Sequence, residues 1–189
     1  MIISLIGTHG TGKTKTLEEI KKQKPDWKYF SEGIRHQIPA FGYKIPYDII
    51  EEVGVGAFEF MIMNYWSVID KKVNSLINDD DIIVTDRSVL DNMAYYFAMR
   101  ETKDDMKFEN VLMSMAKHYA DLIDEFVYFP PHVLPLSGDE MRPDDKDFQV
   151  KIDDSLKDVI KQLNIPSNKV YNLTEVELEK RAEEIIELV

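Results

Sequence analysis

The stretch MIISLIGTHGTGKTKTLEEI, residues 1–20, guides the interpretation of the whole chain. It begins with a short apolar run, passes through a glycine-rich turn and continues with helical periodicity. The turn, GTHGTGKT at residues 7–14, fits the pattern G-x-x-x-x-G-K-[ST] without a mismatch. Between a strand and a helix, this pattern predicts a loop whose backbone amides surround a phosphate group.

We expect this phosphate-binding loop, residues 7–14, to hold ATP and to help bind Mg²⁺. The amine of Lys13 would reach the β- and γ-phosphates, and the hydroxyl of Thr14 would bind the metal. The ring of His9 is expected to matter less than its backbone. The residues predicted to contact ATP are Thr8, His9, Gly10, Thr11, Gly12, Lys13 and Thr14.

Composition and charge indicate one globular domain, residues 1–189, that does not bind DNA through a broad basic surface. The chain is 44% hydrophobic, but none of its apolar runs reaches the roughly 18–20 residues of a membrane span, so no membrane association is expected. It contains no cysteine, which fits a cytoplasmic protein. The net charge of −12 argues against nonspecific binding to nucleic acid. Within 13–44, however, Lys and Arg outnumber Asp and Glu, so a basic surface could still receive an anion.

Short apolar runs alternate with helical periodicity along the chain. This alternation predicts an α/β domain around a central parallel sheet. Gly54 and Gly56 are expected to interrupt or bend the second helical segment. The predicted strands are 2–6, 27–31, 82–86, 126–129 and 169–172, and the predicted helices are about 12–23, 47–78, 88–99, 106–123, 145–163 and 174–188.

A second motif, DIIVTDRSVLDNMAYY at residues 81–96, places charged side chains directly after a predicted buried strand. A carboxylate at the position of Asp86 can orient hydrated Mg²⁺. Arg87 adds a fixed cation where a transferring phosphate would lie. Such a pair can also simply cap a helix, but opposite a phosphate-binding loop the metal-binding interpretation is favoured.

Three segments resemble nucleoside and nucleotide kinases. DRSVLDNMAYY, 86–96, is similar to the DR-x-x-x-S-x-x-AY segment of thymidylate kinases and to the ERS segment of deoxynucleoside kinases. YFSEGIRHQIP, 29–39, resembles the strand-to-helix turn of these enzymes, and 126–153 resembles the strand and lid of NadR-type ribosylnicotinamide kinase-like ATPases. The resemblance implies a three-layer P-loop NTPase fold: a five-stranded parallel sheet ordered 2-3-1-4-5, helices on both faces, and a lid at about 130–150.

The resemblance also implies roles for individual residues. Glu32 would accept the proton of the acceptor hydroxyl, Arg35 and Arg87 would bind anions, and Arg142 would close from the lid onto the triphosphate. As alternatives, Glu32 can be an ordinary helix cap and Arg142 part of a charged loop. The sequence departs from the family pattern at Ser88, which replaces an aromatic residue of thymidylate kinases, and in carrying a single lid arginine.

Residues that could contact the acceptor follow the second and third predicted strands. Phe58, Tyr65 and Trp66 lie in an aromatic–methionine stripe that could stack a base, although such stripes are more often core. Asp91 and Tyr95 lie on the helix after Arg87, where they could contact a sugar or a base edge.

These features predict a Mg-ATP-dependent kinase that acts on a hydroxyl of a small nucleoside- or nucleotide-like acceptor. Two alternatives stay open: a kinase that acts on a modified nucleotide within DNA, and an NTP-binding switch or ATPase without a small acceptor. The sequence also leaves a homodimer open.

Overall fold

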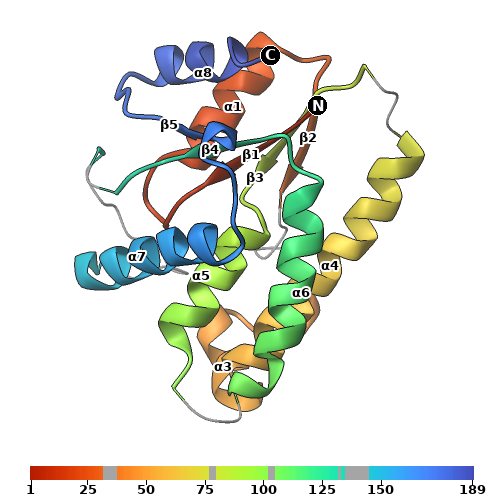
Figure 1. Ribbon diagram of the computed structural model, residues 1–189, viewed down its shortest axis with the longest axis vertical. Coiled ribbons are helices and arrows are strands. Elements are labelled where there is room, and N and C mark those ends of the chain that lie inside the picture. Colours follow the sequence, from red (N-terminus) through yellow and green to blue (C-terminus); the bar gives the residue numbers. More distant parts are fainter. Residues whose placement is uncertain (32–37, 77–79, 102–104, 132, 135–144) are drawn as a thin grey trace.

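The computed structural model describes residues 1–31, 38–76, 80–101, 105–131, 133–134 and 145–189, and in this part of the chain the strands form one parallel sheet (Figure 1). The order is β2-β3-β1-β4-β5, as predicted. The strands are β1 (Ile2–Ile6), β2 (Lys28–Ser31), β3 (Ile83–Asp86), β4 (Glu125–Tyr128) and β5 (Val170–Asn172).

Each predicted helical segment contains a helix in the structure, the second segment is divided into two helices, and the last helix begins at Leu178 rather than at 174. Gly54 ends α3 with a φ of 80°, which a glycine adopts without strain, and α4 begins at the next residue. Gly56 lies within α4. The helices are α1 (Lys13–Gln23), α3 (Pro46–Val53), α4 (Val55–Leu76), α5 (Val89–Met99), α6 (Glu109–Asp121), α7 (Lys146–Gln162) and α8 (Leu178–Ile186), with short 3-10 turns η1 (Asp105–Phe108) and η2 (Ser167–Lys169).

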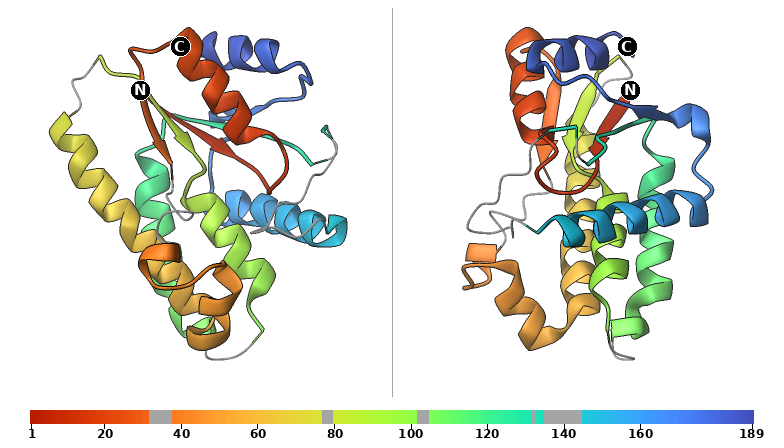
Figure 2. Two further views of the ribbon diagram at one scale, coloured as in Figure 1. Left: turned by 180° about the vertical axis from the view of Figure 1, so that it is seen from behind. Right: turned by 90° about the vertical axis from the view of Figure 1, so that its left-hand side faces the viewer.

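Helices cover both faces of the sheet, because successive side chains along each strand point to opposite sides. Ile3 and Leu5 of β1 pack in a cluster with Leu17 of α1 and Ile185 of α8. Ile6 points the other way, into the larger cluster formed with α4, α5, α6 and α7. Figure 2 shows α1 and α8 together on one side of the sheet and the other helices on the opposite side.

This arrangement brings the two sequence motifs together at the carboxyl ends of two neighbouring strands, β1 and β3. The phosphate-binding loop follows β1, and Asp86 is the last residue of β3, which pairs with β1 in parallel so that Leu5 lies opposite Asp86. Ligands of open α/β sheets bind at the carboxyl ends of the strands. None of the helices in the described ranges is long and apolar enough to cross a membrane.

Candidate active site

The phosphate-binding loop has a backbone that only its glycines can adopt without strain. Gly7, Gly10 and Gly12 have φ angles of 137°, 74° and 88°. A Cβ atom on Gly7 would also lie 2.6 Å from the carbonyl oxygen of Phe129. The loop therefore lies against the end of β4, and the chain turns tightly into α1.

The amine of Lys13 is held inside this loop. Its Nζ donates to the carbonyl oxygens of Gly7 and Thr8, both at 2.6 Å, and to Thr11 Oγ1 at 3.2 Å. Lys13 is only 5% exposed. A buried cation bonded to carbonyls at the centre of the loop is well placed to exchange these partners for phosphate oxygens.

Thr14 and Asp86 form the pair that was predicted to bind the metal. Thr14 Oγ1 donates to Asp86 Oδ2 at 2.7 Å. Hydroxyl and carboxylate oxygens suit Mg²⁺, which is usually held by one or two protein oxygens together with phosphates and water. The pair therefore fits Mg²⁺.

Arg87, directly after β3, has a strained backbone. Its φ is 80°, which is unusual for a residue other than glycine. Two hydrogen bonds, one with β1 and one at the end of β3, hold this conformation: Arg87 N donates to the carbonyl of Leu5, and Thr85 Oγ1 donates to the carbonyl of Arg87, both at 2.9 Å. The buried guanidinium lies 5.3 Å from the ring centre of Tyr95. Strain maintained in this way is typical of functional sites.

Asp91 links the phosphate-binding loop to the start of α5. Its Oδ1 accepts from Gly7 N at 3.0 Å, and its Oδ2 accepts from Ser88 N at 2.8 Å, while Ser88 caps the helix. Burial raises the pKa of the Asp91 carboxyl, and the nearby charges of Lys13 and Arg87 oppose that rise. Both carboxyl oxygens thus position backbone groups of the site, and a contact between Asp91 and an acceptor stays a prediction.

The other side of the loop packs against α5 and α7. His9 Nδ1 lies 3.1 Å from the hydroxyl of Tyr95, and the His9 ring lies 5.8 Å from that of Phe148. The buried Gln149 donates from Nε2 to the carbonyl of His9 at 2.8 Å. The His9 ring therefore contacts α5 and α7, and a contact between His9 and ATP stays a prediction. The first residues of α7 overlap the predicted lid, and α7 contacts the loop directly.

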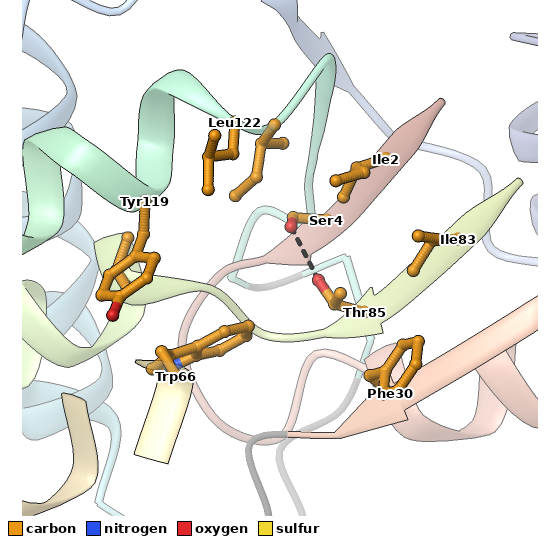
Figure 3. A pocket seen from close by; sticks show the side chains of 10 residues that line it. Ile2, Ser4, Phe30, Trp66, Ile83, Thr85, Tyr119 and Leu122 are labelled. Carbon is orange, nitrogen blue, oxygen red and sulfur yellow. Dashed lines mark hydrogen bonds between the residues drawn. The ribbon is translucent and has the colours of Figure 1, made fainter. Parts of the chain in front are cut away.

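Trp66 lies between a buried polar network and a cavity. Its Nε1 donates to Asn92 Oδ1 at 3.2 Å, and Asn92 Nδ2 donates to Glu59 Oε2 at 3.1 Å. Its ring lines a small pocket of about 60 Å³, partly open to solvent, between the sheet and α4, α5 and α6 (Figure 3). The hydroxyls of Ser4 and Thr85, 2.6 Å apart, lie in the wall that the sheet gives to this pocket.

Of the remaining predicted site residues, the structure describes the side chain of Phe58 only. Phe58 is 2% exposed and packs with Ile38, Ile49 and Ile62, and contact with an acceptor stays a prediction for this residue. Four predictions lie outside the described residues: those for Glu32, for Arg35, for Arg142 and for the side chain of Tyr65.

Sequence reasoning missed several residues that contact the site. Thr85 and Ser4 are hydroxyls within apolar strands, and their matching positions on paired strands were the available signal. Arg181 donates to the phosphate-binding loop from α8, where the signal was a charge on the apolar face of an amphipathic helix. Gln149, also on a helix, carried no such signal.

The strand order, the glycine-rich loop and the Thr14–Asp86 pair define a P-loop protein with the fold of nucleotide kinases. A family model described as an AAA domain matches residues 2–181, nearly the whole chain. The chain belongs to that family. No match is found among curated protein sequences.

Solved structures with the same fold include several kinases. Thymidylate kinase from Candida albicans has a TM-score of 0.72 at 15% identity, with 99% of this chain and 91% of that chain covered. Deoxyadenosine kinase from M. mycoides, with dCMP and dCDP bound, has a TM-score of 0.71 at 14% identity, with 100% and 98% covered. NadR in complex with NR has a TM-score of 0.75 at 15% identity, and the match covers 98% of this chain but 49% of NadR.

Proposed function

We propose that this protein is a Mg-ATP-dependent kinase that transfers the γ-phosphate of ATP to a hydroxyl of a nucleoside- or nucleotide-like acceptor. The observation that carries the proposal is the pairing of Thr14 with Asp86 beside the buried amine of Lys13. This pairing supports a Mg-nucleotide site, because P-loop proteins hold Mg²⁺ with a hydroxyl of this loop and a carboxylate at the end of a neighbouring strand. Similarity of fold to a thymidylate kinase and a deoxyadenosine kinase supports the acceptor class.

Each residue has a role that follows from its chemistry. Lys13 and Arg87 neutralise charge on the phosphates, and Arg142 would add to them from the lid. Thr14 and Asp86 would hold Mg²⁺, which would neutralise phosphate charge and orient the phosphates for transfer.

The proposed acceptor side begins with Glu32. As the general base, Glu32 would take the proton from the acceptor hydroxyl as that oxygen attacks the γ-phosphorus and ADP leaves. Arg35, Tyr65, Trp66 and Tyr95 are proposed to orient the acceptor. A cytoplasmic location and a homodimer stay predictions of the sequence.

The test follows labelled phosphate from [γ-³²P]ATP with Mg²⁺. Separate reactions offer nucleosides, deoxynucleoside monophosphates, ribosylnicotinamide, and DNA with or without hydroxymethylated bases. Label should move to a small acceptor, and Glu32→Gln should abolish the transfer, whereas Glu51→Gln, at an exposed glutamate of α3, should not. Label found only in DNA would favour the DNA kinase. Label released only as inorganic phosphate would favour the ATPase or switch.

A further inference from the structure

Arg181 is a charged side chain buried where the described fold alone does not require a charge. It lies in the first turn and a half of α8 and is only 1% exposed, which makes it one of the largest fully buried side chains of the described chain. Burying a guanidinium has a high desolvation cost, and burial lowers the pKa of Arg181. A methionine could fill the same space without that cost. Packing of α8 onto the sheet therefore does not explain why this buried position carries a charged residue.

The contacts of Arg181 point to the phosphate-binding loop. Nη2 donates to the carbonyl of Thr11 at 3.0 Å, across 170 residues of sequence. The guanidinium carbon lies 4.8 Å from the ring centre of Phe129, and the ring supports the flat group from one side. Nε is buried and has no hydrogen-bond partner in the described structure. Among the described residues, the side chain is thus held by a hydrogen bond to the loop and by stacking, and the nearby carboxylates of Glu175 and Glu184 offset part of its charge.

Arg181 packs so closely against Gly12 that a side chain at position 12 would collide with it. A Cβ atom on Gly12 would lie 2.6 Å from Arg181 Nη1 and 2.8 Å from Leu134 Cδ1. Gly12 is also the N-cap of α1, in a left-handed conformation with φ of 88°. Arg181 therefore contacts the loop from behind, at the residue where the backbone turns to direct its amides toward a phosphate.

We propose that Arg181 is a positioning residue of the ATP site: it fixes the conformation of the phosphate-binding loop at Thr11 and Gly12 and adds a buried cation behind the triphosphate. The inference rests on the proposed function, because it assumes that the loop binds ATP. Within the protein a charge acts through a lower effective dielectric than in water, so it stabilises a nearby polyanion without touching it. This cation would supplement the single arginine of the lid.

The main test is the affinity for Mg-ATP and for tripolyphosphate, measured by calorimetry without any acceptor. Arg181→Met should weaken binding of both ligands at least tenfold at a temperature where the variant is folded. Arg181→Lys retains the charge and should stay within about threefold of the natural protein. Arg100→Met is the matched control, because Arg100 also stacks on an aromatic ring, 4.4 Å from Phe97, but lies on the far end of α5. It should leave both affinities unchanged.

A second variant tests the charge without removing Arg181. Burial lowers the pKa of Arg181, and the nearby carboxylates of Glu175 and Glu184 oppose that shift, so the negative charge of Glu184 offsets part of the charge of the buried guanidinium. Glu184→Gln should bind Mg-ATP about twofold more tightly, and the amide can still accept from the hydroxyl of Tyr171. This variant remains informative if Arg181→Met does not fold.

The outcomes separate this inference from the proposed function. If the natural protein binds neither Mg-ATP nor tripolyphosphate, the proposed function and the inference both fail. If it binds them and folded Arg181→Met binds them equally well, only the inference fails, and Arg181 serves packing alone. A loss in Arg181→Lys as large as in Arg181→Met would overturn the role of the charge. If Arg181→Met does not fold, unchanged affinity in Glu184→Gln overturns the inference.

Discussion

The hydroxyl of Thr14 donates to the carboxylate of Asp86 over 2.7 Å, which joins two motifs that are 72 residues apart in the sequence. The contact arises because β1 and β3 are parallel neighbours, with Leu5 opposite Asp86. The first residues of α1 therefore face the end of β3. In the proposed function, these two oxygens would bind Mg²⁺ beside the phosphates of the nucleotide.

Asp86→Asn should raise the Mg²⁺ concentration required for turnover and lower kcat by about 10²-fold or more. The amide oxygen of the variant can still accept from Thr14, so the loop should keep its conformation while losing the negative charge. The measurement is a Mg²⁺ titration of phosphoryl transfer or, without an acceptor, of ATP binding. Thr14→Ser retains the hydroxyl and serves as the control. A Mg²⁺ dependence identical to that of the natural protein would exclude Asp86 from metal binding.

Lys13→Met should weaken Mg-ATP binding and reduce turnover by about 10²- to 10³-fold, because the neutral side chain cannot bond phosphate oxygens. The methionine keeps most of the buried apolar stem. Lys15→Met, at an exposed position two residues later in α1, should leave both quantities unchanged. Equal affinities in the two variants would show that net charge, rather than the position of Lys13, governs binding.

The Ser4–Thr85 pair should show strong coupling in a double-mutant cycle. Thr85→Val leaves buried polar groups, the Ser4 hydroxyl and the Arg87 carbonyl, without this partner, and we expect a loss of about 1–3 kcal/mol in the free energy of unfolding. Adding Ser4→Ala removes one of those unsatisfied groups, so the double variant should lose less than the sum of the single changes.

The same cycle tests the role of the Arg87 backbone. Thr85→Val should lower kcat while leaving the affinity for Mg-ATP nearly unchanged, because the altered residue supports Arg87 rather than the phosphate-binding loop. Urea unfolding and steady-state kinetics provide the two measurements. If the two changes in the free energy of unfolding are strictly additive and kcat is unchanged, the hydroxyls of Ser4 and Thr85 (Figure 3) have no functional connection to Arg87.

Asp91→Asn should change how stability depends on pH. Burial raises the pKa of Asp91 in the folded state above its ordinary value of 3.8, so the folded state binds this proton more tightly than the unfolded state does. The contribution of Asp91 to the free energy of unfolding is therefore greatest below pH 3.8, and it declines as pH rises toward and through the folded pKa. Asparagine does not titrate, so the stability of Asp91→Asn relative to the natural protein should improve over that interval.

Urea unfolding at several pH values between 3.5 and 7 measures this difference. Asp154→Asn, at an exposed position of α7, is the control and should follow the pH profile of the natural protein. A difference between Asp91→Asn and the natural protein that does not vary with pH, or that moves in favour of the natural protein as pH rises, would contradict the prediction.

The fold was predictable because its signals are local. The apolar runs of the strands, the helical periods between them and the pattern of residues 7–14 each lie within one short segment, and the strand order followed from the resemblance to kinases. The break at Gly54 was also predictable, because glycine tolerates the φ of 80° found there. The roles of Lys13, Thr14 and Asp86 were predicted from the two motifs alone.

The supporting contacts of the site depend on the tertiary structure. Asp91 bonds to Gly7 across 84 residues, Gln149 to His9 across 140, and Arg181 to Thr11 across 170. Spacing in the sequence carries no information about such pairs, because folding alone brings their elements together. The sequence therefore specified which residues could bind a phosphate. The packing of α5, α7 and α8 around the loop decided which side chains hold it in place, because a buried polar group is stable only where the fold supplies its partner.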